Sequence, residues 1–490
     1  MPCHIFPYLL LALNTFVAAD VAPIADFVAY QSGRFGLSPN QTYYTSNVTS
    51  PIFLVNTWDK AAVDNASHIF LSYGNSPETG VGMLFSANDL SLVWFQKETS
   101  EQKVNNVGIQ KFQGNDYLVY WLGKQTVGHG NGHWVMLNPS YDIVYNITTT
   151  GLPVGADFHE FRLTDEGTAL ITVYNPIPYN LRKVGGWKKD TLLDSVFQEV
   201  DVITGKALFT WHAIDHFSIA DTFVPYYKGP DGWDWCHINS IEKTVNGNYV
   251  VSFSFCSMVV YIDGTSGIPI WIMGGKKNQF TDRATGRAPD FAFQHDPVFH
   301  DKDLKHLTMA DGEVVLDLQF GVIGRALGSY RVYKRNWEGY PTSDPSIVVQ
   351  RQNASSPEIL YVSWNGATEV KCWALLASAS VNPLRRATVV DAVPRAGYET
   401  AILVRTSARF IRAAGLDAQK NVLGMSAMWD RENESMVNID NRWQFEHHCS
   451  NAQYGGRDIS TSSCSCANVP VWVESRYLGI SGATEFDNGS

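Results

Sequence analysis

Residues 157–174 read DFHEFRLTDEGTALITVY, and this stretch decides how the rest of the chain is interpreted. Two short, largely apolar runs flank a turn at 165–167, which is typical of an antiparallel β-hairpin. The stretches WCHINSIEKTVNGNYVVSF at 235–253 and FQHDPVFHDKDLKHLTM at 293–309 have the same form. The earlier stretch VGIQKFQGNDYLVYW at 107–121 has it without the histidine. The recurrence predicts one repeated β unit.

A second kind of hairpin accompanies these units. Residues 259–272 turn at Gly264-Thr265-Ser266-Gly267, and residues 197–211 repeat the design around Thr204-Gly205-Lys206. Two hairpins make a four-stranded blade, and blades that recur at several dozen residues are typical of a β-propeller. A set of β-sandwiches is the competing all-β fold, but it does not explain histidines that return at one strand position. We therefore expect an all-β chain with a β-propeller over residues 20–355.

The pattern changes near residue 355. An inner Trp364, and later a long strand that leads through a turn to Ser426, resemble a small fibronectin-like β-sandwich over residues 356–430. The tail at 431–490 carries three cysteines and many polar residues. We interpret it as either a disulfide-tied flap or a partly disordered segment.

The composition of the 490-residue chain excludes several classes of protein. Hydrophobic residues make up 45 % and charged residues only 17 %, so global disorder is excluded. The net charge is −11 and no run of Lys and Arg exceeds two residues, which disfavours nucleic acid as a partner. After residue 19 no stretch is long enough to span a membrane, so no membrane span is expected in the mature chain.

The N-terminus predicts export. Residues 1–19 contain an apolar run that ends on Val17-Ala18-Ala19, as in a secretory signal peptide, although a buried strand is an alternative. Sequons for N-glycosylation support a secreted, extracellular glycoprotein. They begin at Asn40, Asn47, Asn65, Asn146, Asn353, Asn433 and Asn488.

Six cysteines remain once the signal peptide is removed, and an exported chain can oxidise all of them. Their spacing does not indicate a zinc site. Cys236 and Cys256 are expected to be near-neighbours across the hairpin whose turn is Asn246-Gly247. A disulfide beside His237 is therefore one hypothesis, and two packed thiols or pairing with the tail are the others.

The candidate functional residues are His159, His237 and His295. Each lies in the first strand of a repeat, and the innermost strands of a propeller line its central channel. Three imidazoles gathered there can bind zinc or copper. They can instead bind an oxyanion, with one of them acting as nucleophile or general base. The residues alone leave both possibilities open.

The ordered set of motifs at these histidines resembles the fungal branch of the arylsulfotransferase (ASST) family. The resemblance covers roughly residues 90 to 430. It rests on Asp157-Phe158-His159-Glu160-Phe161, Cys236-His237-Ile238-Asn239-Ser240, Trp271-Ile272-Met273-Gly274-Gly275-Lys276, Phe293-Gln294-His295-Asp296 and Tyr361-Val362-Ser363-Trp364-Asn365-Gly366.

The resemblance implies a six-bladed propeller that moves a sulfuryl group from a phenolic sulfate donor to a phenolic acceptor. It implies no cofactor and no use of the nucleotide donor PAPS, and the sequence contains no P-loop motif. His295 matches the histidine that takes the sulfuryl group covalently. His237 and His159 match two supporting histidines, and Asn239 is expected to bind substrate.

One position departs from the family. Ser254 stands where the family usually has an arginine, and a missing guanidinium removes a charge-assisted contact with the sulfuryl oxygens. Lys276 is a candidate substitute, with a surface lysine as the alternative interpretation. Three hypotheses follow: a secreted aryl sulfotransferase, a propeller that binds ligands without chemistry, and a metal-dependent channel enzyme. The glycine-rich residues 128–133 are interpreted as a tight loop between strands.

Overall fold

A computed structural model gives the coordinates, and the chain divides into two compact units. The larger unit comprises Ala22–Gln41 and Ser50–Thr342. The smaller unit comprises three segments: the chain up to Val21, Thr42–Thr49, and the chain from Ser343 onward. The structure describes residues 20–76, 79–97, 102–281, 291–299, 304, 307–309, 314–323, 329–351, 353, 355–381, 387–437 and 445–446. The signal peptide predicted at 1–19 and most of the tail lie outside these residues. The domain boundary at 355 remains a prediction.

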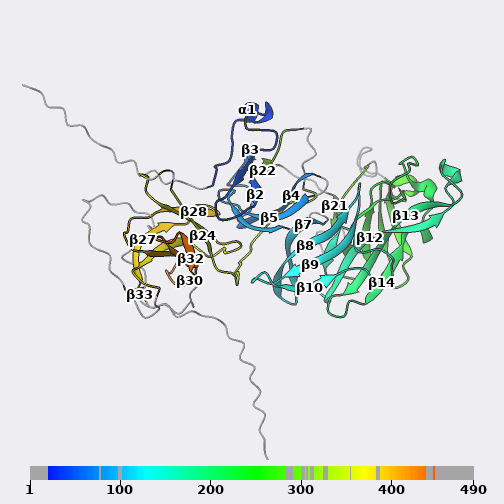
Figure 1. Ribbon diagram of the computed structural model, residues 1–490. Coiled ribbons are helices and arrows are strands. Elements are labelled where there is room, and N and C mark those ends of the chain that lie inside the picture. The colour runs from blue at the N-terminus through cyan, green and yellow to red at the C-terminus, as the bar shows by residue number, and fades with distance from the viewer. Residues whose placement is uncertain are drawn as a thin grey trace, which may run out of the picture. The chain divides into compact units, whose positions relative to one another are not determined.

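The larger unit is built from antiparallel sheets whose strands follow one another along the chain (Figure 1). The first combines β4 (His68–Ser76), β5 (Thr79–Ser86), β6 (Leu92–Lys97) and β23 (Tyr333–Arg335), and the second β7 (Lys103–Phe112), β8 (Asn115–Gln125), β9 (Gly130–Leu137) and β10 (Ile143–Ile147). The third contains β11 (Phe161–Leu163), β12 (Thr168–Tyr179), β13 (Asp190–Asp201), β14 (Ala207–His212) and the parallel β15 (Trp233–Asp234). The fourth contains β16 (Ile238–Lys243), β17 (Tyr249–Phe253), β18 (Met258–Ile262) and β19 (Pro269–Gly274).

Short elements complete the chain. Two-stranded sheets pair β20 (Pro297–Phe299) with β21 (Leu307–Met309), β22 (Leu316–Gln319) with β3 (Leu54–Trp58), and β1 (Asn40–Thr42) with β2 (Thr49–Pro51). The helix α1 (Phe27–Gln31) starts at Asp26, whose carboxylate accepts a hydrogen bond from the amide of Ala29. Among the described residues, no helix has the length and apolar character to cross a membrane.

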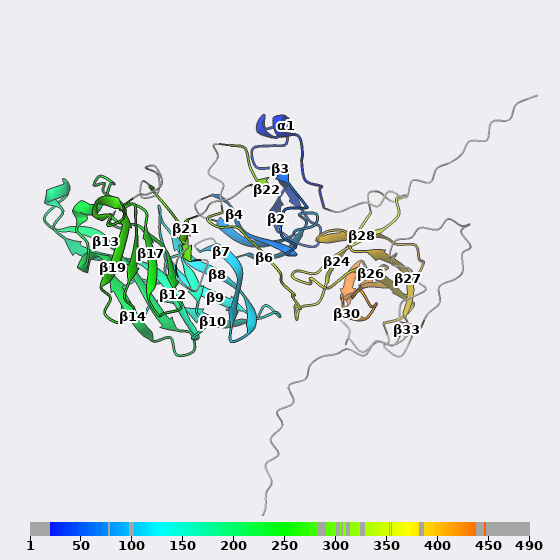
Figure 2. The same cartoon turned by 180° about the vertical axis from the view of Figure 1, so that it is seen from behind.

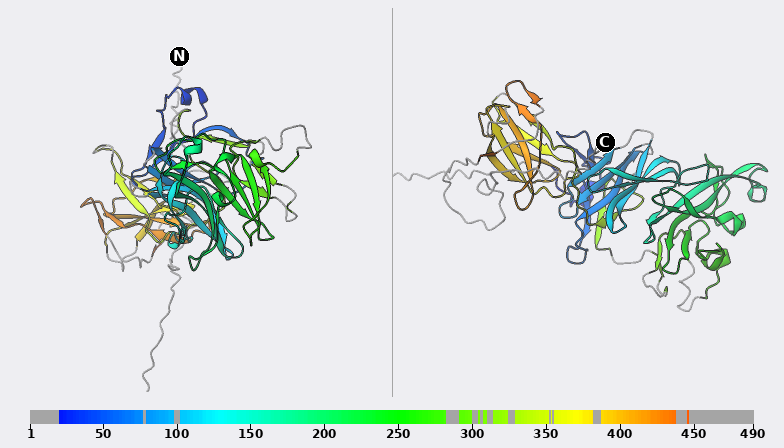
Figure 3. Two further views of the ribbon diagram at one scale, coloured as in Figure 1. Left: turned by 90° about the vertical axis from the view of Figure 1, so that its right-hand side faces the viewer. Right: turned by 90° about the horizontal axis from the view of Figure 1, so that it is seen from below.

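Neighbouring sheets of the larger unit share a core. Every residue of β17 and β18 is buried, because both faces of this sheet are covered (Figure 2). One apolar cluster joins Leu170 and Phe197 of the third sheet to Val251 and Val260 of the fourth. These buried strands read as continuous apolar runs for this reason. The third and fourth sheets form the green part of Figure 3.

The structure corrects the position of the three histidines within their repeats. The sequence places them inside first strands, but β11, β16 and β20 begin only after His159, His237 and His295 respectively. Aspartate side chains that hydrogen-bond nearby backbone amides interrupt the extended chain at the first two sites. The backbone around His295 has left-handed residues on both sides.

The smaller unit has two sheets. One contains β24 (Ser346–Gln350), β25 (Ile359–Ser363) and β28 (Glu399–Leu403). The other contains β26 (Cys372–Ser378), β27 (Ala387–Pro394), β29 (Phe410–Leu416), β30 (Val422–Met425), β31 (Met428–Asp430), β32 (Ser435–Val437) and β33 (Phe445–Glu446). A single apolar cluster contains Leu360 and Val362 from the first and Trp373 and Ile411 from the second. The all-β class is thus confirmed, while a closed propeller and a fibronectin-like sandwich remain predictions.

Candidate functional site

His159 is held by a buried carboxylate. Its Nδ1 lies 2.5 Å from Oδ1 of Asp157, and the same oxygen accepts the His159 amide at 2.8 Å. The other oxygen of Asp157 accepts the amide of Gly130 at 2.6 Å. Burial raises the pKa of Asp157, but His159 and these hydrogen bonds together lower it by more than burial raises it. The pKa is therefore below its usual value, and the group is ionised. Because Nδ1–H faces the carboxylate, Nε2 is the nitrogen left for a ligand.

His237 repeats this arrangement with a different backbone. Its Nδ1 lies 2.5 Å from Oδ2 of Asp234, and its amide donates to Oδ1 of Asp234 at 3.1 Å. The residue has a φ of 57°, which is uncommon for a side chain other than glycine and is found often at functional sites. Phe255 stacks on the imidazole with ring centroids 4.4 Å apart. The carboxylate and the phenyl ring together fix the tautomer and the plane of the ring.

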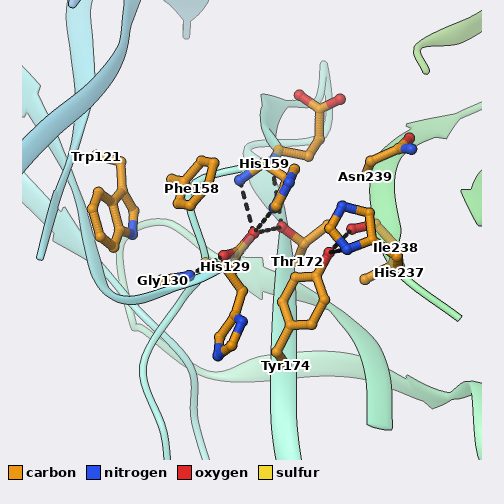
Figure 4. Close-up of polar contacts among 12 residues, drawn as sticks. Trp121, His129, Gly130, Phe158, His159, Thr172, Tyr174, His237, Ile238 and Asn239 are labelled. Carbon is orange, nitrogen blue, oxygen red and sulfur yellow. Dashed lines mark hydrogen bonds and ion pairs between the residues drawn. The ribbon is translucent and has the colours of Figure 1, made fainter. Parts of the chain in front are cut away.

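The two aspartate-bound histidines meet in one cluster (Figure 4). Their ring centroids are 4.8 Å apart and their planes are nearly perpendicular, at 87°. Tyr174 of β12 lies beside both rings, and its hydroxyl donates to the carbonyl of Ile238 at 2.7 Å. The sequence therefore predicted correctly that His159 and His237 converge.

His295 joins the cluster with a different hydrogen-bond partner. Its Nδ1 donates to the carbonyl of Phe293 at 2.9 Å, so Nε2 carries the lone pair when the ring is neutral. Burial lowers the pKa of His295, and the nearby His237 and Arg331 lower it further. His295 is exposed, and its ring lies 6.1 Å from the Tyr330 ring, which in turn lies 4.8 Å from His159.

Gln294 anchors the loop that carries His295. Its side-chain amide donates to Oγ of Ser252 and to the carbonyl of Met258, both in the fourth sheet. Its own carbonyl accepts from the side-chain amide of Asn239 at 2.8 Å. Asn239, the predicted substrate-binding residue, is fully buried, and its described hydrogen bond holds the backbone of the loop that carries His295.

The other two predicted binding residues lie in different surroundings. Ser254 is buried, and its amide donates to the carbonyl of His237 at 2.9 Å. Lys276 is exposed, and its ammonium donates to the carbonyls of Ala220 and Thr222. Lys276 also lies 4.9 Å above the Phe223 ring. These contacts and the exposure of Lys276 agree with the alternative interpretation of a surface lysine.

The structure places two arginines at the cluster that sequence reasoning missed. Arg331 forms a bidentate ion pair with the buried Glu160, at 3.2 to 3.3 Å, and donates to the carbonyl of Asn239. Arg162 pairs with Asp296, the neighbour of His295, at 2.9 Å. The first arginine bridges the third and fourth sheets, and the second joins the His295 loop to β11. Arg331 is far in sequence from Glu160, and Arg162 is far from Asp296, so no local motif predicted either contact.

The glycine-rich residues 128–133 have a larger role than a tight loop. Only Gly128 and His129 of this stretch lie in the connection between β8 and β9, because β9 begins at Gly130, and the Gly130 amide binds Asp157. His129 stacks on Tyr174 with centroids 5.2 Å apart, and its buried Nδ1 has no hydrogen-bond partner. A fourth imidazole therefore borders the cluster. The Gly-His-Gly pattern after a strand was its only sequence signal.

Cys236 and Cys256 are neighbours, as the hairpin register predicted. Their Sγ atoms lie 2.7 Å apart, and both are buried, free thiols. Cys236 directly precedes His237, and Cys256 directly follows Phe255, whose ring stacks on His237. A disulfide between the two cysteines remains a prediction. Cys372 of the smaller unit is disulfide-bonded.

Chemically, the cluster offers imidazole nitrogens, guanidinium groups and aromatic rings. No three His, Cys, Asp or Glu side chains of the described part converge as metal ligands would. The class defined here is an all-β protein whose site suits an anionic group attached to an aromatic ring.

Comparison with known families agrees with this class. Residues 108–314 match the model of the arylsulfotransferase (ASST) family, and the match includes all three histidines. This supports the family resemblance of the larger unit. A comparison with curated proteins found no match.

Two solved structures show remote similarity. A protein of unknown function from Bacteroides caccae is 14 % identical over 62 % of this chain and 84 % of its own, with a TM-score of 0.29. Dihydro-heme d1 dehydrogenase NirN, in complex with DHE, is 9 % identical over 79 % of this chain and 77 % of its own, with a TM-score of 0.24. TM-scores this low carry no argument about fold or function.

Proposed function

We propose that the protein is a PAPS-independent aryl sulfotransferase-like enzyme. It moves a sulfuryl group from a phenolic sulfate donor to a phenolic acceptor through a covalent intermediate on His295. Asn239 positions the His295 loop in this proposal, while Ser254 and Lys276 are not assigned contacts with substrate. The match of residues 108–314 to the arylsulfotransferase family supports the reaction class.

The observation that carries the proposal is the contrast between the hydrogen bonds of the three histidines. His295 gives its Nδ1 proton to a carbonyl, and its lowered pKa keeps it neutral, so Nε2 is a competent nucleophile. His159 and His237 give theirs to carboxylates, so each ring presents Nε2 to the site in a fixed orientation. Burial lowers the pKa of His159, although Asp157 acts in the opposite direction, and Nε2 of the neutral ring can accept a proton. One ring is thus suited to attack, and a second to act as base towards the acceptor phenol.

The chemistry proceeds in two displacements. Nε2 of His295 attacks sulfur, the S–N bond forms, and the S–O bond to the donor phenol breaks with its electron pair on the phenolic oxygen. The acceptor phenol then loses its proton to Nε2 of the neutral His159 ring and attacks the same sulfur. The S–N bond breaks, and His295 recovers its lone pair. Two steps avoid binding two phenols at once.

Arg331 explains how such a site can work with Ser254 at the usual arginine position. The side chain of Arg331 is 14 % exposed, and its guanidinium acts electrostatically on His295. It reaches the cluster from a segment distant in sequence, beside Glu160 and Asn239. Positive charge is therefore available to the transferred group without a guanidinium at position 254.

We further propose that the larger unit is a six-bladed propeller, that residues 356–430 form a small sandwich, and that the chain is secreted after loss of residues 1–19. The successive four-stranded sheets support the first proposal. The described sequon asparagines support glycosylation, because all of them are exposed. They are Asn40, Asn47, Asn65, Asn146, Asn353 and Asn433.

A second candidate function is a propeller that binds ligands without transferring a group. The buried Ser254 favours it, because a charge-assisted clamp on the sulfuryl group is missing at that position. In that case the cluster binds an aryl sulfate, and no transfer to a second phenol follows.

The test is transfer from 4-nitrophenyl sulfate to phenol, followed through nitrophenolate absorbance. We expect release that depends on the acceptor, and its loss in His295→Ala. His216→Gln is the matched control, because His216 stacks on Trp211 and contacts none of the three histidines. Folded wild-type protein that binds 4-nitrophenyl sulfate but releases no nitrophenolate, with any of several acceptors, supports the binding function instead.

A further inference from the structure

Tyr330 has a buried hydroxyl that forms no hydrogen bond. It lies shortly before β23, and its Oη is shielded from solvent and meets no group in good hydrogen-bonding geometry, although the neighbouring Arg331 guanidinium interacts with the phenol. Buried polar groups in folded proteins nearly always have a partner, and an exception asks for an explanation. One such explanation is that the hydroxyl forms its hydrogen bond only when a ligand is bound.

The surroundings of this hydroxyl are those of the histidine cluster. The Tyr330 ring meets His159 edge to face, with centroids 4.8 Å apart and planes at 82°. It lies 6.1 Å from His295 and 5.4 Å from Phe158. Tyr330 therefore stands between a supporting histidine and the nucleophile, on a wall made of aromatic rings. An aryl group bound against that wall brings its phenolic oxygen near the cluster.

The charge state of Tyr330 suits a donor. Burial raises its pKa, and the nearby Glu160 and Asp157 carboxylates add to this, while Arg331 acts in the opposite direction. The phenol thus keeps its proton at neutral pH and can donate a hydrogen bond to an oxygen that gains negative charge.

We propose that Tyr330 is a further catalytic residue, which donates a hydrogen bond to the bridging phenolic oxygen of the donor while its S–O bond breaks. This role rests on the proposed sulfuryl transfer. The electron pair of the broken bond stays on the phenolic oxygen, and Tyr330 shares its proton without transferring it. His159 and His237 remain available at Nε2 for the other reacting groups, because their bonds to aspartate are made at Nδ1.

The test compares Tyr330→Phe with wild type on a series of aryl sulfates whose leaving phenols differ in acidity. We expect a loss in kcat/KM of about a hundredfold with phenyl sulfate, by analogy with the removal of one oxyanion donor. The loss should be smaller with 4-nitrophenyl sulfate, because its more acidic phenol needs less help. Tyr226→Phe is the matched control, since the Tyr226 hydroxyl binds Asp190 and not the cluster.

Thermal unfolding provides a readout that does not depend on activity. Because the hydroxyl of Tyr330 has no partner, Tyr330→Phe should unfold at the wild-type temperature or above it. An equal loss with every donor, no loss at all, or a clear drop in the unfolding temperature overturns the proposed role. If wild type transfers sulfuryl from no donor, the proposed function fails as well, and the comparison distinguishes the two failures.

Discussion

The imidazoles of His159 and His237 meet edge to face, 4.8 Å apart, although their strands belong to different sheets. Each ring is bound at Nδ1 by an aspartate that also accepts the backbone amide of the same histidine. One carboxylate thereby sets both the local backbone and the tautomer of the ring. Both rings therefore present Nε2 in a fixed orientation, which depends on the two carboxylates.

Asp157→Asn should lower kcat/KM on the order of a hundredfold or more, because an amide no longer fixes the tautomer of His159 or stabilises its charged form. An asparagine has a single acceptor oxygen, so it cannot accept from both His159 and the Gly130 N–H as the two carboxylate oxygens of Asp157 do. Steady-state kinetics with an aryl sulfate measure the effect. Asp116→Asn is the control, since Asp116 forms an exposed ion pair with Lys111. Activity of Asp157→Asn near the wild-type value would show that Asp157 does not position His159 for the reaction.

The pH dependence should report the lowered pKa of His295. In the proposed mechanism His295 attacks in its neutral form, so kcat/KM should fall when the pH drops below the pKa of this ring. Burial lowers that pKa from 6.5, and the acidic limb is therefore expected below pH 6.5. A profile of kcat/KM between about pH 4 and 8 locates it. A limb at 6.5 or higher would contradict the assigned environment of His295.

Arg331→Met should destabilise the larger unit as well as reduce transfer. Glu160 is 2 % exposed, and without Arg331 its charge stays buried and loses its bidentate partner. Breaking such a pair costs about 3–5 kcal/mol, whereas Arg331→Met combined with Glu160→Gln should recover much of the stability. Urea denaturation of both variants tests this. Equal stabilities of the single and double variants would show that the pair does not compensate the buried charge.

Gly130→Ala should disturb both packing and the site. A Cβ at this position lies 2.6 Å from the Trp121 ring and 2.9 Å from Phe158, closer than real contacts allow. The resulting overpacking costs about 1–3 kcal/mol and moves the amide that binds Asp157. Thermal unfolding and kinetics measure the two effects. Gly114→Asn, in an exposed turn with open space and a φ of 82°, should change neither.

Sequence reasoning found the histidines because they recur at one place in a repeated hairpin. It did not find their exact setting, since it placed them in strands and the structure places them just before strands. Asp157 is two residues from His159 and Asp234 is three from His237, so the pairs look like ordinary loop composition in the sequence. Only the backbone turn brings each carboxylate onto Nδ1.

The remaining parts of the site come from segments that no local pattern connects. Tyr330 and Arg331 reach the cluster from beside β23, a strand that pairs with β4 far earlier in the chain. The glycine-rich loop was recognised as a loop, but its amide contact with Asp157 depends on packing against Trp121. Such relationships are set by tertiary structure, whereas the all-β class follows from alternation and turn residues alone.

The most direct test of this account is to find the sulfuryl group on the protein itself. Wild type mixed rapidly with 4-nitrophenyl sulfate, without acceptor, should release a burst of nitrophenolate close to one equivalent of enzyme. Alkaline quenching and peptide mass spectrometry should then place one sulfuryl group on the peptide with His295, and addition of phenol before the quench should remove it. A stable, folded protein that shows neither burst nor modified peptide, yet transfers sulfuryl when both phenols are present, would contradict the covalent histidine mechanism.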